Sequence, residues 1–137
     1  MTPDREGVTE LAERVQVFRA GQRGSRAPSV QTAGIQREEL ISTDHSWVGI
    51  AHTEPESVSG WHHHGEYETY IYVITGRLGL EFGPGGKESM EAGPGDVFYI
   101  PRGVVHRELT LGAEKGTAFL VRLGKGEPVI NVDGPDG

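Results

Sequence analysis

The sequence predicts an all-β domain of the sandwich or closed-barrel type. Its 137 residues suffice for one domain with a hydrophobic core but are too few for two. The 21 glycines and 8 prolines favour short strands joined by tight turns over a helical bundle. Short apolar segments also recur along the chain without long helices between them, a spacing typical of sandwiches and barrels.

The first part of the chain predicts strands at the edge of this domain. Residues 8–20 show mixed periodicity, which indicates one helical turn and then a strand at 15–18. The stretch GQRGSRAPS that follows is typical of a loop. Strands are expected next at 37–41 and 47–52, and the pair Glu54-Pro55 ends the second of them.

The clearest strand is TYIYVI, residues 69–74, because β-branched and aromatic side chains fill it. Thr75 and Gly76 form a predicted turn, after which residues 78–82 return as the second strand of a hairpin.

Three further strands are expected beyond this hairpin, at 87–91, 97–100 and 117–123, separated in part by the turn sequences GPGG and GPG. We therefore divide the chain into an N-terminal extension with edge strands (1–40), the barrel (41–125) and a Gly/Pro-rich tail (126–137) that is ordered only at 129–132.

Net charge and cysteine content exclude several classes of function. Thirteen basic and twenty acidic residues give a net charge of −7, which argues against binding to nucleic acid or to an anionic membrane and favours a small-molecule partner. The chain has no cysteine, so thiolate catalysis, disulfides and Cys-type zinc sites are excluded. No apolar run approaches the roughly 18 residues of a membrane span, and residues 1–14 lack the apolar centre of a signal peptide. We expect a cytoplasmic protein.

Three consecutive histidines, His62, His63 and His64, are the first candidate ligands. In a strand, residues two apart face the same side, so His62 and His64 project together and His63 projects oppositely. Two imidazoles on one face suit a shared divalent cation, because a neutral nitrogen is available near pH 7. Solvated surface histidines are the alternative reading.

A second pattern adds a third histidine. The stretch GDVFYIPRGVVH places Gly95, Pro101, Gly103 and His106 in the spacing G-x5-P-x-G-x2-H. Together with the H-x-H pair, this resembles the two motifs of the cupin superfamily, although Thr110 stands where the second motif usually has Asn. The resemblance implies a jelly-roll β-barrel that holds one divalent metal ion on His62, His64 and His106 from neighbouring strands.

The fourth ligand position of the cupin motif is ambiguous here. Counted forward from His64, it falls on Glu68; counted back from Gly76, it falls on Thr69. Either a bulge turns Glu68 into the barrel, or the site has three histidines with Thr69 beside them and open positions for water or substrate. We favour the second arrangement, because Thr69, Ile71 and Val73 then form one regular alternating row.

The remaining histidines and tyrosines are weaker candidates. His52 is expected to be structural or on the surface, and His45 to be solvated in a turn. The tyrosines of the predicted strands are expected to pack rather than to act as catalytic acids: Tyr70, Tyr72 and Tyr99.

Two classes of function remain open at this point. One is an enzyme, a metal-dependent dioxygenase or isomerase that uses Fe, Mn, Ni, Cu or Zn to activate O2 or to act as a Lewis acid. The other is a non-catalytic module that binds or senses a small molecule. In either case the cupin resemblance implies a homodimer, paired through strand exchange or edge-to-edge packing.

Overall fold

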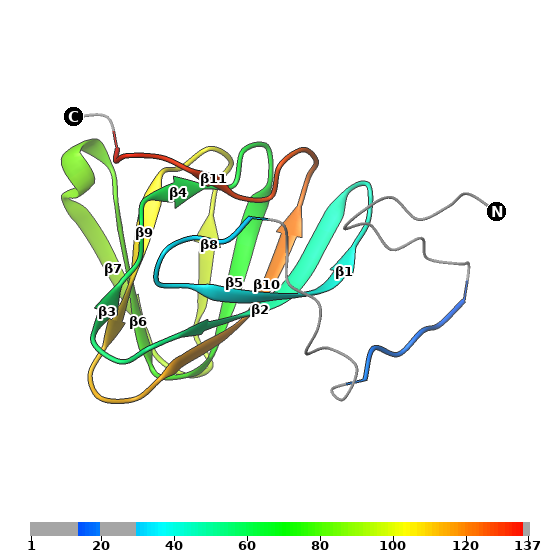
Figure 1. Cartoon of the computed structure of the whole chain (residues 1–137), viewed down its shortest axis with the longest axis horizontal. Coiled ribbons are helices and arrows are strands. Elements are labelled where there is room, and N and C mark those ends of the chain that lie inside the picture. Colours follow the sequence, from blue (N-terminus) through cyan, green and yellow to red (C-terminus); the bar gives the residue numbers. More distant parts are fainter. Residues whose placement is uncertain (1–13, 20–29, 136–137) are drawn as a thin grey trace.

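Two antiparallel β-sheets face each other in the computed structural model of the chain, which describes residues 14–19 and 30–135 (Figure 1). The two sheets form the double-stranded β-helix, or jelly roll, that the sequence predicts. Within the described part of the chain, no helix has the length and apolar character needed to cross a membrane.

The first sheet has five strands in the order β1-β2-β10-β5-β8. All neighbours in it are antiparallel, and β10 lies between β2 and β5 along its whole length. In this order the strands are β1 (Gln36–Ser42), β2 (Ser46–Thr53), β10 (Gly116–Leu123), β5 (Glu68–Thr75) and β8 (Val97–Ile100).

The second sheet follows the order β11-β4-β9-β6-β7, and β3 pairs with β9 beside this path. A short 3-10 turn, η2 (Pro84–Gly86), joins β6 to β7 at the GPGG sequence. The strands are β11 (Ile130–Asn131), β4 (His62–His63), β9 (His106–Leu111), β6 (Arg77–Phe82), β7 (Glu88–Ala92) and β3 (Ser57–Val58).

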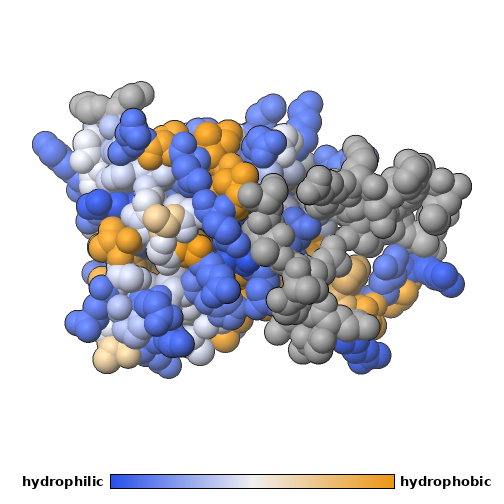
Figure 2. Space-filling view, in the orientation of Figure 1, coloured by the Kyte–Doolittle hydropathy of each residue, from blue (hydrophilic) through white to orange (hydrophobic). Residues whose placement is uncertain are grey.

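The hydrophobic core fills the space between the sheets because buried and exposed residues alternate along the strands. In β5, for example, Ile71 and Val73 are buried, whereas Tyr72 between them is 48% exposed. The core cluster consists of Ile35, Trp47, Ala51, Tyr67, Ile71, Val73, Leu78, Leu80, Ala92, Phe98, Ile100, Ala118 and Leu120. On the side seen in Figure 1, hydrophilic groups interrupted by a few hydrophobic ones cover the described surface (Figure 2).

Most expected strands are confirmed to within one or two residues, and in the tail Ile130 and Asn131 form β11, which pairs with β4. The strand expected at 15–18 is wrong, because residues 14–19 form no strand. Val15 and Val17 are 94% and 62% exposed, so the apolar alternation there has no partner surface to bury it. The preceding helical turn and the whole of the GQRGSRAPS loop lie outside the described residues.

The predicted hairpin of residues 69–74 and 78–82 is also wrong. Its two strands, β5 and β6, lie in different sheets, and β5 is already flanked by β10 and β8. Gly76, with a φ of 82°, carries the chain from one sheet to the other, and a Cβ there would lie 2.8 Å from the carbonyl oxygen of Lys115. A tight turn shows only that the chain reverses, not that the two strands pair. The hairpin in this region is β6–β7.

The close packing of Gly49 in β2 gives a test of the fold. A Cβ at this position would overlap the Trp47 ring and the carbonyl oxygen of Glu38 on β1. We expect Gly49→Ala to lower the free energy of unfolding by about 2 kcal/mol, the usual effect of overpacking a core. Gly79→Ala is the matched control, since its Cβ would meet nothing closer than 3.6 Å. Urea unfolding measures both, and an equal loss in the two variants contradicts the packing described at Gly49.

Candidate metal centre

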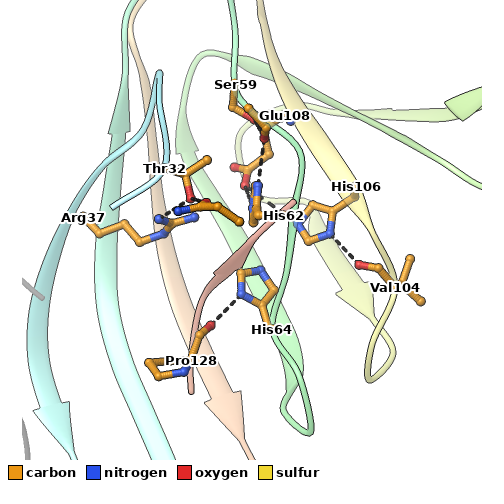
Figure 3. Close-up of polar contacts among 11 residues, drawn as sticks. Thr32, Arg37, Ser59, His62, His64, Val104, His106, Glu108 and Pro128 are labelled. Atoms are coloured by element: carbon orange, nitrogen blue, oxygen red, sulfur yellow. Dashed lines mark hydrogen bonds and ion pairs between the residues drawn. The ribbon is translucent and has the colours of Figure 1, made fainter. Parts of the chain in front are cut away.

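Three buried histidines meet between the sheets (Figure 3). His62 is the first residue of β4 and pairs in register with His106, the first residue of β9. His64 follows β4, where a turn closed by a hydrogen bond from the Tyr67 N–H to the His64 carbonyl begins. The three side chains are 0%, 1% and 3% exposed for His62, His106 and His64 respectively.

His63 faces the other way, as strand alternation predicts. It is only half-buried, and its Nδ1 accepts a hydrogen bond of 3.0 Å from the N–H of Gly65. The division of the histidine triplet into two inward rings and one outward ring is thus observed.

Backbone carbonyls orient the three inward rings. Nδ1 of His62 donates to the carbonyl of Gly60 (3.0 Å). Nδ1 of His64 donates to that of Pro128 (2.8 Å), and Nδ1 of His106 to that of Val104 (2.9 Å). A carbonyl can only accept, so each Nδ1 carries a proton and the neutral ring keeps its lone pair on Nε2. Such a bond is the usual way in which proteins hold a metal-binding imidazole in one tautomer.

One nitrogen of each ring points toward the other two rings. Nε2 of both His62 and His106 is buried without a hydrogen-bond partner. One ring nitrogen from each of the three histidines lies within 4.8 Å of the others, and the ring centroids are 4.3–5.2 Å apart. Unsatisfied buried polar atoms are rare in proteins, and these converge. The three histidines can therefore hold a metal ion.

Two of the three histidines, His64 and His106, are in the protonation state that a metal needs. Burial, together with the neighbouring His62, lowers the pKa of His106 from 6.5 to about 4. Burial and then the positive charge of Arg122 lower the pKa of His64 well below 6.5. Both rings are consequently neutral at neutral pH and need not lose a proton to coordinate a cation.

Glu108 is a fourth polar group at this site, and the sequence analysis missed it. It lies two residues after His106 on β9, and its Oε2 is 3.3 Å from Nε2 of His62 and 4.0 Å from Nε2 of His106. Burial alone raises the pKa of Glu108, but contact with His62 and the nearby positive charges outweigh it and lower the pKa to about 2. The sequence does contain a pattern that indicates Glu108, because an H-x-E spacing in a strand puts both side chains on one face.

The contact between Glu108 and His62 has a chemical consequence. The carboxylate has only lone pairs to offer, and Nε2 of the neutral ring also presents a lone pair. Two such atoms at 3.3 Å repel each other unless a positive charge lies between them. Either a second proton on His62 or a cation shared by both groups removes this repulsion. Nε2 of His106 also lacks a hydrogen-bond partner, and a cation would bind this nitrogen as well, which favours the cation.

At the ambiguous motif position, Thr69 faces inward and Glu68 faces outward. Thr69 is fully buried, and its Oγ1 has no hydrogen-bond partner. Glu68 accepts hydrogen bonds from the hydroxyls of Tyr70 (3.2 Å) and Tyr99 (3.0 Å) on the outer face of the first sheet. The pairing of β5 with β8 is regular at Thr69, so no bulge turns Glu68 into the barrel.

The weaker candidates lie away from the three histidines. His52 is 42% exposed and contacts Glu38 Oε1 at 2.8 Å, and His45 is exposed in the turn between β1 and β2. Tyr72 and Tyr99 are 48% and 52% exposed on the outer face of the sheet.

One protein-family model matches the part of the chain that contains the three histidines. The model of the cupin domain matches residues 49–122, more than half of the chain and the whole span from the histidine triplet to His106. The chain belongs to the cupin family. Comparison with curated protein sequences gives no match.

Several solved structures share this fold at low sequence identity. A Klebsiella pneumoniae protein with a double-stranded β-helix domain has a TM-score of 0.68 and 19% identity, over 87% of this chain and 98% of that one. KdgF from Halomonas sp. has a TM-score of 0.61 and 21% identity, over 80% and 96%. A mutant of Bacillus subtilis oxalate decarboxylase has a TM-score of 0.67 and 17% identity, over 81% of this cupin and 31% of the larger chain.

Proposed function

We propose that this cupin is a mononuclear metalloprotein that binds a divalent cation through His62, His64 and His106 and acts on a small molecule there. The observation that carries the proposal is the pair of buried, unpartnered Nε2 atoms, whose rings are already fixed in the metal-binding tautomer by backbone carbonyls. Burying such atoms is unfavourable unless a partner compensates, and a cation compensates both at once.

The donor set suits a first-row transition metal. Imidazole favours Zn, Cu, Fe and Ni, a carboxylate extends the choice to Mn, and the chain offers no thiolate. Bound there, such an ion supplies a Lewis acid or, if redox-active, a site for O2. The chain's own groups orient the ligand nitrogens, place the negative charge of Glu108 beside them and leave the hydroxyl of Thr69 free for a substrate.

We infer an enzyme, a dioxygenase or an isomerase, rather than a binding module. An oriented site with a carboxylate at 3.3 Å can take up or release a proton next to the cation, which passive binding does not require. Oxygen uptake or isomerisation that depends on both substrate and metal supports the enzyme; tight ligand binding without turnover supports the sensing alternative. A cytoplasmic location remains part of this proposal.

We also propose a homodimer, and the outer face of the first sheet is the candidate interface. Val97, Tyr72 and Phe119 lie side by side across β8, β5 and β10 and are 58%, 48% and 37% exposed. Ile74 and Tyr99 extend this apolar row. A contiguous exposed apolar surface of this kind is typical of interfaces between subunits.

The metal site is tested on untagged protein. We expect His62→Ala and His106→Ala each to weaken metal binding by more than roughly 100-fold, because each removes a metal ligand. Loss of a group that only hydrogen-bonds to a ligand already weakens binding roughly 10–100-fold. His63→Ala is the matched control and retains binding, since this ring faces outward. Elemental analysis and calorimetric titration at fixed pH measure both, and equal losses in His62→Ala and His63→Ala contradict the site.

Two matched glutamate variants test the carboxylate. We expect Glu108→Gln to weaken metal binding at least about tenfold, because the amide keeps the shape but loses the charge next to the cation. Glu68→Gln removes a carboxylate from the outer face and leaves metal affinity unchanged. Competition with a metal-binding dye ranks the two, and the reverse order would mean that Glu68 is the ligand.

The homodimer is tested by a charge in the apolar row. Tyr72→Lys places a cation at the centre of this row and is expected to shift the protein from dimer to monomer at micromolar concentration without unfolding it, since position 72 faces outward. Light scattering gives the mass of both forms. A wild-type protein that is already monomeric refutes the proposed dimer.

A further inference from the structure

Two arginines are buried inside the barrel. Arg37 comes from β1 and is 2% exposed, and Arg122 comes from β10 and is 1% exposed. Both belong to the first sheet, opposite the strands that carry His62 and His106. Arginine is rarely buried to this degree unless its charge is paired. We call Arg37 and Arg122 the arginine pair.

Most hydrogen-bond donors of the arginine pair have no partner. Arg37 donates from Nη1 to Oγ1 of Thr32 at 2.9 Å, but its Nε and Nη2 have no acceptor. The Arg122 guanidinium lies over the Trp47 ring at 4.4 Å, and its Nε and Nη1 have no acceptor. Within residues 14–19 and 30–135, no carboxylate forms an ion pair with either side chain.

The arginine pair lies beside the histidine site. Figure 3 shows Arg37 reaching from β1 toward His62 and Glu108. The charge of Arg122 acts on His64 and His106, that of Arg37 acts on Glu108, and the two guanidinium groups act on each other. Burial, and then Arg37, lower the pKa of Arg122 to about 9, so it stays cationic at neutral pH.

The carboxylates inside the barrel do not satisfy these donors. Glu108 contacts His62 and His106, and Glu39 accepts the indole N–H of Trp47 at 2.8 Å. Their two negative charges balance the two guanidinium charges in number, and a divalent cation then leaves the interior with an excess of positive charge. An anion is the species that this interior lacks.

We propose that the arginine pair receives the carboxylate of a small organic acid whose other oxygens reach the metal position on the histidines. This inference deepens the proposed function, because it names the ligand class for the same site. A guanidinium presents its N–H groups as a planar fork that matches the two oxygens of a carboxylate. The ligand has to be small, since donors that are 1–2% exposed leave no room for a large one. The free Oγ1 of Thr69 offers it one further hydrogen bond.

Calorimetric titration with formate, acetate, oxalate, malonate and succinate, and with inorganic phosphate for comparison, tests the proposal on metal-free and manganese-loaded protein. We expect at least one carboxylate to bind both forms, and the loaded form more tightly. Arg37→Met and Arg122→Met each weaken that binding at least about tenfold, because each removes a charge-assisted fork. Arg77→Met, at an exposed arginine paired with Glu91, leaves it unchanged.

Thermal unfolding separates this role from a structural one. If the arginine pair is kept for a ligand, the Met variants without anion melt no lower than wild type, because an unsatisfied buried charge has been replaced by an apolar chain of similar length. If Arg122 is kept for its contact with Trp47, Arg122→Met melts lower and still binds the acid, which overturns the proposal. Should a Met variant not fold, the Lys variants decide, since they keep the charge but not the fork and must bind the acid more weakly.

Metal titration of the same variants keeps the two proposals apart. Metal affinity that is unchanged in the Arg variants, with carboxylate affinity lost, supports both. Carboxylate binding that depends on the arginine pair in a protein that binds no metal supports this inference and overturns the metal site. Absence of carboxylate binding in both forms, or tighter binding of phosphate than of every carboxylate, overturns the ligand class proposed here.

Discussion

The three hydrogen bonds from imidazole Nδ1 to backbone carbonyls are the constraint on which the rest of this structure depends. They fix where the three Nε2 lone pairs point, and each needs a carbonyl from a different part of the chain: Gly60 before β4, Val104 before β9 and Pro128 before β11. The pairing of His62 with His106 brings the first two together. The pairing of Ile130 with His63 holds the C-terminal segment against β4 and so brings Pro128 to His64. A tail rich in glycine and proline thereby becomes part of the wall of the site.

The interior has two regions, an apolar core and a region of buried polar groups around the histidines. Around Ile71, Val73 and Leu120 it is an ordinary apolar core, and these side chains are at most 3% exposed. Around the histidines it instead holds unpartnered nitrogens, an unpartnered hydroxyl and two guanidinium groups with free donors. Such groups destabilise a fold, because each has left water without gaining a partner. A cluster of them in one region, beside a well-packed apolar core, is what the proposed ligands would account for, because ligands that bind the folded chain restore the lost stability.

The sequence predicted the fold class, the family and the three histidines because each rests on local information: alternation, turn residues and motif spacing. It failed where the answer depends on which strands become neighbours. The chain reversal at Gly76 was correctly located, but its role as a crossing between sheets depends on β10 and β8 flanking β5. Glu108 could have been predicted, because the alternation that puts His62 and His64 on one face also puts Glu108 on the face of His106. Arg37 and Arg122 were harder to find, because arginine in a strand is ordinarily assigned to the surface, and only the assembled sandwich shows that their side chains are enclosed.

The two sheets contribute different chemistry to the same interior. Strands β4 and β9 of the second sheet provide His62, His106 and Glu108, whereas β1, β10 and β5 of the first provide Arg37, Arg122 and Thr69. A metal ion on the histidines engages the second sheet, and the arginine pair engages the first. A small acid bound as proposed would touch both and so link the two sheets across the sandwich, and its binding would depend on the distance between them as well as on charge. Because the groups sit on regular paired strands rather than on long loops, that distance is set by the packing of the apolar core, which would make the core a determinant of which acids fit.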